Sequence, residues 1–404
     1  MTVPRVPAIV LAAALGLAFA ACALPGPTAP GRPSSTAAPS AGPPWLDAAI
    51  TQPADVTGWA SQPPGYFCDP CHNLAEDDLF GVAATPAGLI AVGVVQPPAR
   101  AIAFASSDGR AWTPIPTLTG GPGGAALAVA SSDERTVIVG HDSRGATAWS
   151  SAGEAWAEAQ AQASLLVPHA AGGMTSVVAF GGGFVAGGYR DDPEHAALAA
   201  AAWRSPDGLT WTADDPIAVF AGGRIQGLAA SGSTIVAVGT GGDVIYGPAA
   251  AWRWTAATGW RRAELAPDAG GAMRAVVATP AGFVAVGLDA HDDGARVWTS
   301  ADGLRWTAVP DQEAFRSFGQ PVRMHSVALG PGGLVAGGWR SDPGKGSALT
   351  WASADGRQWS ATWQVSFSGA QIDGVAILGG TGVAVGRTGY PDTNTAAIWI
   401  RAVP

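Results

Sequence analysis

One cysteine pair has a spacing that serves haem and redox chemistry. Cys68 and Cys71, followed directly by His72, form a C-x-x-C-H pattern, in which two thioether bonds hold a c-type haem and the histidine ligates its iron. The chain has three cysteines, and the third, Cys22, follows the apolar N-terminal stretch. The remaining pair would most simply form a disulfide in an oxidising compartment. We therefore expect a disulfide and no cofactor, with haem attachment, metal binding and free thiols as alternatives.

A second set of residues shares one position in a short strand-like segment that recurs along the chain. The position is apolar in the first two copies and polar in the last five, as Phe80, Leu127, Thr175, Gln226, Arg274, His325 and Asp373. Guanidinium groups bind carboxylates through paired hydrogen bonds. A position that varies while the scaffold repeats is also where binding chemistry can vary. We expect six residues to form a ligand-binding arc: Arg224, Gln226, Arg274, Arg323, His325 and Asp373. We expect no catalytic residue and no metal ligand. The alternative is a solvated lining in which Arg274 and Asp373 offset each other's charge.

The segments that carry this arc belong to a repeat. Each is followed by an apolar strand that ends in glycine, at Gly93, Gly140, Gly188, Gly239, Gly287, Gly338 and Gly386. These glycines are 47 to 51 residues apart, which is the period of a four-stranded propeller blade. The fifth repeat, for example, contains strand-like segments at 273–276, 282–287, 295–300 and 305–310. We predict an all-β fold, a seven-bladed β-propeller of four-stranded antiparallel blades.

An Asp-Gly dipeptide joins the third and fourth strands of four repeats. The copies read AFASSDGRAW (103–112), AAWRSPDGLTW (201–211), RVWTSADGLRW (296–306) and LTWASADGRQW (349–359). Asp-Gly predicts a two-residue hairpin, because glycine accepts a positive φ. The third and fourth strands together offer fourteen aromatic positions, which hold 13 of the 17 tryptophans. Such regular placement favours packing between blades over a ligand platform.

These hairpins resemble the Asp-box of sialidases and related propellers, Ser-x-Asp-x-Gly-x-x-Trp, with Asp and Gly one residue closer together. The match covers Ser106, Asp108, Gly109 and Trp112; Ser205, Asp207, Gly208 and Trp211; Ser300, Asp302, Gly303 and Trp306; Ser353, Asp355, Gly356 and Trp359. The resemblance implies a structural turn, remote from any active site, whose aspartate accepts nearby backbone N–H groups. It leaves a sialidase-like glycoside hydrolase as an alternative function. However, the chain lacks a Phe-Arg-Ile-Pro motif, and sialidases have six blades. Photosystem II assembly factors contain similar propellers, which they use for a non-catalytic role.

The last repeat ends one strand short. A segment near the N-terminus, 55–61 with Trp59, resembles the outer-strand segment 257–262. Pairing this segment beside the last repeat would remove a free sheet edge. We therefore expect an N-terminal strand to close the last blade. We divide the chain into a signal peptide (1–21), a lipidated cysteine with a Pro/Ala/Ser-rich tether (22–44) and the propeller (45–404).

The N-terminal segment reads as an export signal. Arg5 precedes an apolar stretch, 8–20, which is too short to span a bilayer. It ends in Phe19-Ala20-Ala21-Cys22, which resembles the lipobox of bacterial lipoproteins, with Phe19 in place of the usual leucine. The resemblance implies that Cys22 is lipidated; the alternative is an ordinary signal peptide cut near Ala21. We expect an exported protein, anchored at Cys22 on the outer side of the cytoplasmic membrane or at the cell surface.

Composition restricts the partners. The formal net charge is −9 and only 13% of residues are charged, so a nucleic-acid backbone is not expected as a partner. We expect a monomeric, non-catalytic binding or scaffold propeller that contacts the membrane only through its lipid. Its ligand would be a protein or a glycan at the mouth of the central channel. The alternatives are a glycoside hydrolase and a c-type haem protein.

Overall fold

The computed structural model describes residues 78–402 apart from short gaps. The gaps are residues 97, 116–117, 119–122, 154, 161–163, 166–171, 193–196, 215–216, 243–246, 292, 317–319, 343–344, 363–367 and 390–394. The expected signal peptide, the tether with Cys22, the C-x-x-C-H pattern at Cys68–His72 and the expected closing strand around Trp59 lie outside the described residues.

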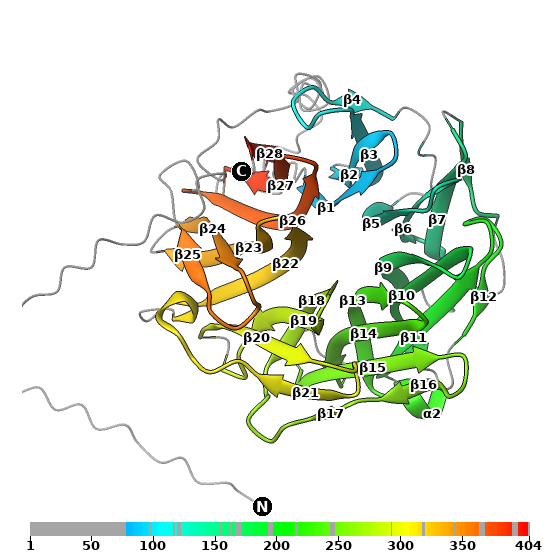
Figure 1. The fold of residues 1–404 in the computed structure, drawn as a ribbon. Helices are drawn as coiled ribbons and strands as arrows, with labels where there is room; N and C mark the ends of the chain where they lie inside the picture. Colours follow the sequence, from blue (N-terminus) through cyan, green and yellow to red (C-terminus); the bar gives the residue numbers. More distant parts are fainter. Residues whose placement is uncertain are drawn as a thin grey trace, which may run out of the picture. The chain divides into compact units, whose positions relative to one another are not determined.

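Seven sheets follow one another along the described chain and stand around one axis, as blades 1 to 7 (Figure 1). The innermost strands are β1 (Asp78–Thr85), β5 (Ala125–Ser131), β9 (Gly172–Phe180), β13 (Gly223–Ser231), β18 (Ala272–Thr279), β22 (Val322–Gly330) and β26 (Ala370–Leu378). The second strands are β2 (Gly88–Val95), β6 (Thr136–Asp142), β10 (Gly183–Asp192), β14 (Thr234–Gly241), β19 (Gly282–Leu288), β23 (Gly333–Asp342) and β27 (Thr381–Thr388). The third strands are β3 (Arg100–Ser106), β7 (Gly145–Ser151), β11 (Ala197–Ser205), β15 (Ala249–Thr255), β20 (Ala295–Ser300), β24 (Lys345–Ser353) and β28 (Thr395–Ala402). The outer strands are β4 (Thr113–Pro114), β8 (Trp156–Glu158), β12 (Thr212–Ala213), β16 (Gly259–Arg262), β21 (Arg305–Ala308) and β25 (Ser360–Thr362).

The ring is closed through its innermost strands. Each contacts the innermost strand of the next blade, and β26 of blade 7 contacts β1 of blade 1. The prediction of an all-β, seven-bladed propeller of four-stranded antiparallel blades is confirmed. Blade 5 carries an additional strand, β17 (Glu264–Leu265), parallel to β21, and blade 7 has three described strands.

Helix is almost absent from the described chain. It is limited to one turn of α-helix, α2 (Ile217–Phe220), and the 3-10 helix η3 (Glu313–Phe315). Within the described ranges, no helix has both the length and the apolar character needed to cross a membrane.

The two faces of the ring carry different parts of each blade. The innermost strand begins where the second strand ends, as the pairing of Asp78 with Val94 shows. We call this side the channel-mouth face. The turn between the third and outer strands lies on the opposite side, because Ser106 at the end of β3 pairs with Leu89 at the start of β2. We call that side the Asp-box face.

Tryptophans fill the spaces between blades, as the sequence predicts. In the fifth blade, Trp298 and Trp306 pack with Val236 and Val238 of the preceding blade. The largest fully buried side chains include Trp149, Trp203, Trp211, Trp252, Trp298, Trp306, Trp351 and Trp399. Burying one such ring removes about 150–250 Å² from water, which corresponds to an upper estimate of about 4–6 kcal/mol. The tryptophans therefore hold the blades together.

The Asp-box turn differs from the expected two-residue hairpin. In blade 5, β20 ends at Ser300 and β21 begins at Arg305, so residues 301–304 separate the two strands, and the pair nearest the turn is Thr299 with Thr307. Ser300 Oγ accepts the N–H of Gly303 at 2.8 Å, while Asp302 Oδ1 accepts the N–H groups of Leu304 and Arg305. The predicted hairpin is present, because β20 and β21 are consecutive and pair antiparallel, but its two-residue turn is not. The turn is longer because these side-chain acceptors take the N–H groups that a tight turn would bond through its own backbone.

The same bonds hold the turn in the other Asp-box blades. The serine accepts the glycine N–H at 2.7–2.8 Å, and the tryptophan Nε1 donates to the glycine carbonyl at 2.9–3.1 Å. Backbone N–H groups of Arg110 and Ala111 lower the pKa of Asp108, and those of Gln358 and Arg357 lower the pKa of Asp355. These aspartates are structural acceptors.

Candidate functional site: the channel mouth

Every innermost strand contains one residue that has no partner in the second strand. In blade 5, Met273 pairs with Gly287 and Ala275 pairs with Val286, so Arg274 between them forms a β-bulge. The seven bulged residues are Phe80, Leu127, Thr175, Gln226, Arg274, His325 and Asp373. All seven are half-buried. The position that the sequence singled out is therefore structurally equivalent in all seven blades, near the channel-mouth face.

The residue before each bulge has the opposite character. These residues are Leu79, Ala126, Met174, Ile225, Met273, Met324 and Ile372, and each is 0% exposed. Met273, for example, packs in the cluster that contains Trp298. The bulge thus places two adjacent residues in different roles, one in the packing between blades and the next at the channel mouth.

The bulge also explains the glycine that ends each second strand. A Cβ on Gly287 would overlap the carbonyl oxygen of Ala272, which lies two residues before the bulge. The same overlap with the equivalent carbonyl occurs at Gly93, Gly140, Gly188, Gly239, Gly338 and Gly386. The repeated glycine was therefore a sequence signal for seven bulges. Sequence reasoning used it only to count blades.

A chain of polar contacts joins blades 6, 7 and 1. His325 Nδ1 lies 3.0 Å from Asp373 Oδ1, which also accepts Gln371 Nε2 at 2.7 Å. Arg387 Nη2 donates to Gln371 Oε1 at 3.2 Å, and its Nη1 lies 3.0 Å from Asp78 Oδ2. The Asp78 side chain is only 4% exposed, so this ion pair is nearly buried. The chain links the last blade to the first.

Aromatic rings support two of the candidate arginines. The guanidinium carbon of Arg224 lies 4.4 Å from the centre of the Tyr189 ring of the neighbouring blade 3. That of Arg323 lies 5.3 Å from the centre of the Trp339 ring in its own blade. A guanidinium over the face of an aromatic ring is attracted by the ring's π electrons. Both arginines are thus positioned by rings at the channel mouth.

One histidine near this face is shifted toward its neutral form. Burial lowers the pKa of His141 below its ordinary value of 6.5, and the charge of Asp142 opposes this effect. His141 follows the glycine of β6 and pairs with Ala125 at the start of β5. The Asp142 carboxylate binds the Arg144 side chain, which also reaches Glu158 at 2.5 Å. This end of blade 2 is therefore a local ionic cluster.

The predicted residues fall into two structural positions. Gln226, Arg274, His325 and Asp373 are the bulged residues of blades 4 to 7. Arg224 and Arg323 lie two residues earlier, inside β13 and β22. They belong to the strands because pairing with the second strand continues on both sides of the bulge.

Other residues of this face contact the candidate residues or one another, and the sequence did not show these contacts. They are Asp78, Tyr189, Trp339, Gln371 and Arg387. Asp78 and Arg387 lie at opposite ends of the described chain, so their pairing becomes visible only when the ring closes. Thr175 was seen in the sequence, and its hydroxyl donates to the carbonyl of Ile225 in the next blade at 2.6 Å.

A metal site needs several ligating side chains close together. Among the described residues, no group of three or more His, Cys, Asp or Glu side chains is arranged to hold a metal ion. The haem and disulfide alternatives for Cys68 and Cys71 stay predictions.

The comparisons with known proteins place the fold. No protein-family model matches the chain, and no curated protein sequence matches it. The structure of YCF48 bound to a D1 peptide has a TM-score of 0.52 and 16% identity, over 82% of this chain and 93% of that chain. A Trypanosoma rangeli sialidase with sialic acid has a TM-score of 0.42 and 12% identity, over 68% and 53%. The periplasmic gluconolactonase of Pseudomonas aeruginosa has a TM-score of 0.45 and 11% identity, over 81% and 96%. At these identities the likeness concerns the fold.

Proposed function

We propose that this chain is a non-catalytic binding propeller, held outside the cytoplasmic membrane by a lipid on Cys22. Its channel-mouth face would bind an acidic segment of a partner protein. The observation that carries the proposal is the β-bulge that recurs at the same position of all seven innermost strands. The scaffold before and after it is nearly constant, while the bulged residue changes from blade to blade and becomes polar from blade 3 onward.

The charges at the mouth favour an anionic ligand. Blades 4, 5 and 6 each carry an arginine on the innermost strand, as Arg224, Arg274 and Arg323. The carboxylate of Asp373 is already engaged by His325 and Gln371 at the seam of blades 6 and 7. The acidic group of the arc is therefore held on the side of blade 7, and the arginines define a positive region in a chain of net charge −9. Such a region attracts carboxylates and excludes cations.

A protein segment suits this surface better than a single small anion. The arginines come from three consecutive blades, so the positive region extends along the rim of the channel mouth. An extended peptide presents carboxylates at intervals along its length. Among the similar structures, YCF48 is a propeller of this fold that was determined with a peptide bound. This supports a peptide as the ligand class to test first.

The test measures binding of synthetic peptides rich in Asp and Glu to the parent and to arc variants by fluorescence anisotropy. Arg274→Ala and Arg323→Ala should each weaken binding by roughly 10- to 100-fold, because a charge-assisted hydrogen bond contributes about 1.5–3 kcal/mol. Arg110→Ala is the matched control, since it removes the same charge from an exposed residue of an Asp-box turn on the opposite face. It should bind like the parent.

Two results would contradict the proposal. The arc is the wrong site if both arginine variants bind the acidic peptides as tightly as the parent. The partner class is wrong if the peptides fail to bind while a carboxylate-bearing glycan binds and is lost in the same two variants. Raising the salt concentration should weaken true arc binding, because exposed charges are screened.

A further inference from the structure

The Asp-box turn of one blade packs against a fixed position of the blade before it. In blade 5, the turn glycine Gly303 lies against Val236 of blade 4, where a Cβ on the glycine would overlap a valine methyl group. Trp306 of the same turn belongs to the same buried cluster as Val236. Val236 is the third residue before the glycine that ends its strand.

This contact recurs in every blade that has a complete Asp-box. Blade 1 packs Gly109 and Trp112 on Val383, blade 3 packs Gly208 and Trp211 on Val137, and blade 6 packs Gly356 and Trp359 on Val284. Each of these valines is again the third residue before the terminal glycine of the second strand. Blade 4 lacks the box, but its Trp260 belongs to the same buried cluster as Val185, the equivalent residue of blade 3.

Where the turn is incomplete, the position opens into a cavity. Blade 2 keeps only part of the box, and its turn is short, because Ser151 pairs directly with Trp156. Its Gly153 has nothing within contact distance of a Cβ. A cavity of about 960 Å³ lies there, lined among others by Ile90 and Ala105 of blade 1. Ile90 is the residue of blade 1 that is equivalent to Val236.

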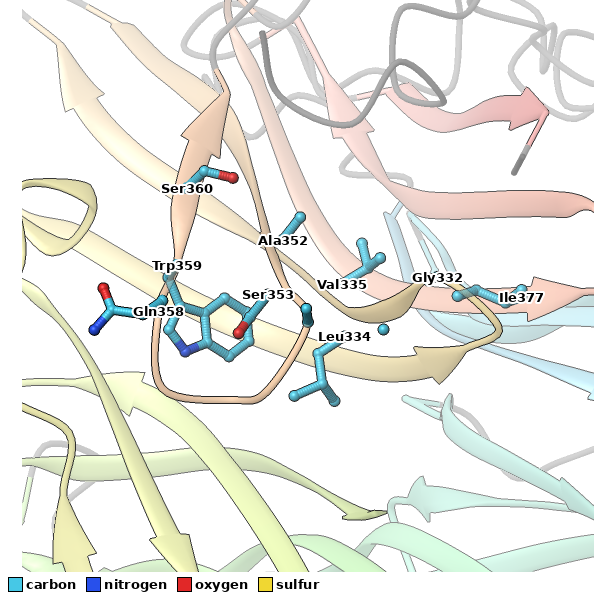
Figure 2. Close-up of a pocket in the computed structure, with 11 residues that line it drawn as sticks. Gly332, Leu334, Val335, Ala352, Ser353, Gln358, Trp359, Ser360 and Ile377 are labelled. Atoms are coloured by element: carbon cyan, nitrogen blue, oxygen red, sulfur yellow. The ribbon is translucent and has the colours of Figure 1, made fainter. Parts of the chain in front are cut away.

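Blade 6 shows the same opening on its side toward blade 7. Val335, the equivalent residue of this blade, lines a cavity of about 330 Å³ with Ala352, Ser360 and Ile377 (Figure 2). In that view, Val335 and Ala352 point to one side of the sheet and Leu334 points to the other. The turn that should cover Val335 would belong to blade 7. In the described chain that blade ends with β28, which pairs with β27.

We propose that this cavity is the binding site of the chain's own segment 55–61, with the Trp59 indole on Val335. The segment reads Val56-Thr57-Gly58-Trp59, close to Ala257-Thr258-Gly259-Trp260 of blade 4. In blade 4, Trp260 is buried in the same cluster as the equivalent residue Val185. Segment 55–61 thus matches the one type of turn that fills this position without a complete Asp-box.

The blade 4 pattern also sets a register for the segment. There, Arg261 pairs with Arg253, and Arg253 is the residue after Trp252. Trp399 of β28 is the equivalent of Trp252, because both pair with the alanine two residues before the terminal glycine. Ala60 should therefore lie opposite Ile400. A strand in this register enters blade 7 at the Asp-box face, the side opposite the arc.

The first measurement is the melting temperature of the full chain. Trp59→Ala should lower it by on the order of 10 °C, as Trp306→Ala should, because each removes an indole from an interblade contact. Trp45→Ala is the matched control and should change it by no more than ~2 °C. A Trp59→Ala protein that melts like the parent would overturn the proposal.

The second measurement distinguishes where the segment binds. Ala60→Cys combined with Ile400→Cys should form a disulfide within one chain on mild oxidation, identified by mass spectrometry of the linked peptides. Ala60→Cys combined with Ala105→Cys, which lines the blade 1 cavity, should not. Cross-linking to Ala105→Cys, linkage between two chains, or no linkage to Ile400→Cys would each overturn the assignment. Neither measurement depends on the proposed ligand.

Discussion

A single methyl group on Gly287 tests the link between the repeated glycine and the channel-mouth site. In Gly287→Ala, the new Cβ would overlap the carbonyl oxygen of Ala272, which is backbone and cannot rotate away. Overpacking a core typically costs about 1–3 kcal/mol, and an overlap with backbone lies at the upper end. We therefore expect a loss of about 3 kcal/mol, or roughly 6–12 °C in melting temperature. The alternative is that the strand relieves the overlap by losing its bulge.

Loss of the bulge would also change the site. A shift of one residue moves side chains to the opposite face of the strand, so Arg274 would leave the channel mouth. The assay therefore combines thermal unfolding, followed by tryptophan fluorescence, with acidic-peptide binding at a temperature where the variant is folded. Gly270→Ala is the control, because its Cβ would lie 3.4 Å from that of Ala290, an ordinary contact. The reasoning is refuted if the two variants melt at the same temperature.

Two further predictions concern acid and the membrane. The folded pKa of His141 lies below 6.5 and that of Asp355 below 3.8, so the unfolded chain binds more protons below each of those values. The melting temperature should fall gently as the pH drops below 6.5, and fall further below 3.8. His141→Gln should abolish the decrease that begins at 6.5. If this variant shows the same pH dependence as the parent, His141 is not the group responsible. Cys22→Ala should release the protein from the membrane fraction, whereas an unmodified mature N-terminus by mass spectrometry would exclude the lipid anchor.

The architecture could be predicted because its signals are local and repeated. Each blade contains the same glycine and the same aromatic positions, so seven spaced copies define both the fold and the number of blades. The Asp-box turn could not be predicted as well, because the Ser300 and Asp302 side chains compete with backbone bonding in a way that the Asp-Gly signal does not express. The ion pair of Asp78 and Arg387 joins distant parts of the chain and depends on closure of the ring.

The sequence predicted which residues form the candidate site, but not the β-bulge that places them there. Alternation along a strand cannot reveal a bulge, because the extra residue is defined by a missing partner on the neighbouring strand. The repeated glycine held that information, since only a displaced carbonyl makes glycine necessary at the end of every second strand. In a propeller, a recurring glycine opposite the start of the innermost strand therefore indicates where a side chain is turned toward the channel mouth.

The bulged residues also differ in how far binding can be separated from folding. Thr175 bonds the carbonyl of Ile225 in the next blade, and His325 bonds Asp373 across the seam of blades 6 and 7. Replacing any of these side chains removes a contact between blades, so their variants should lose stability whatever they bind. Arg323, two residues before the bulge of blade 6, lies over the ring of Trp339 in its own blade, and the neighbouring Met324 is fully buried. We therefore expect Arg323→Ala to weaken ligand binding with a smaller loss of stability than a change at Met324 would cause.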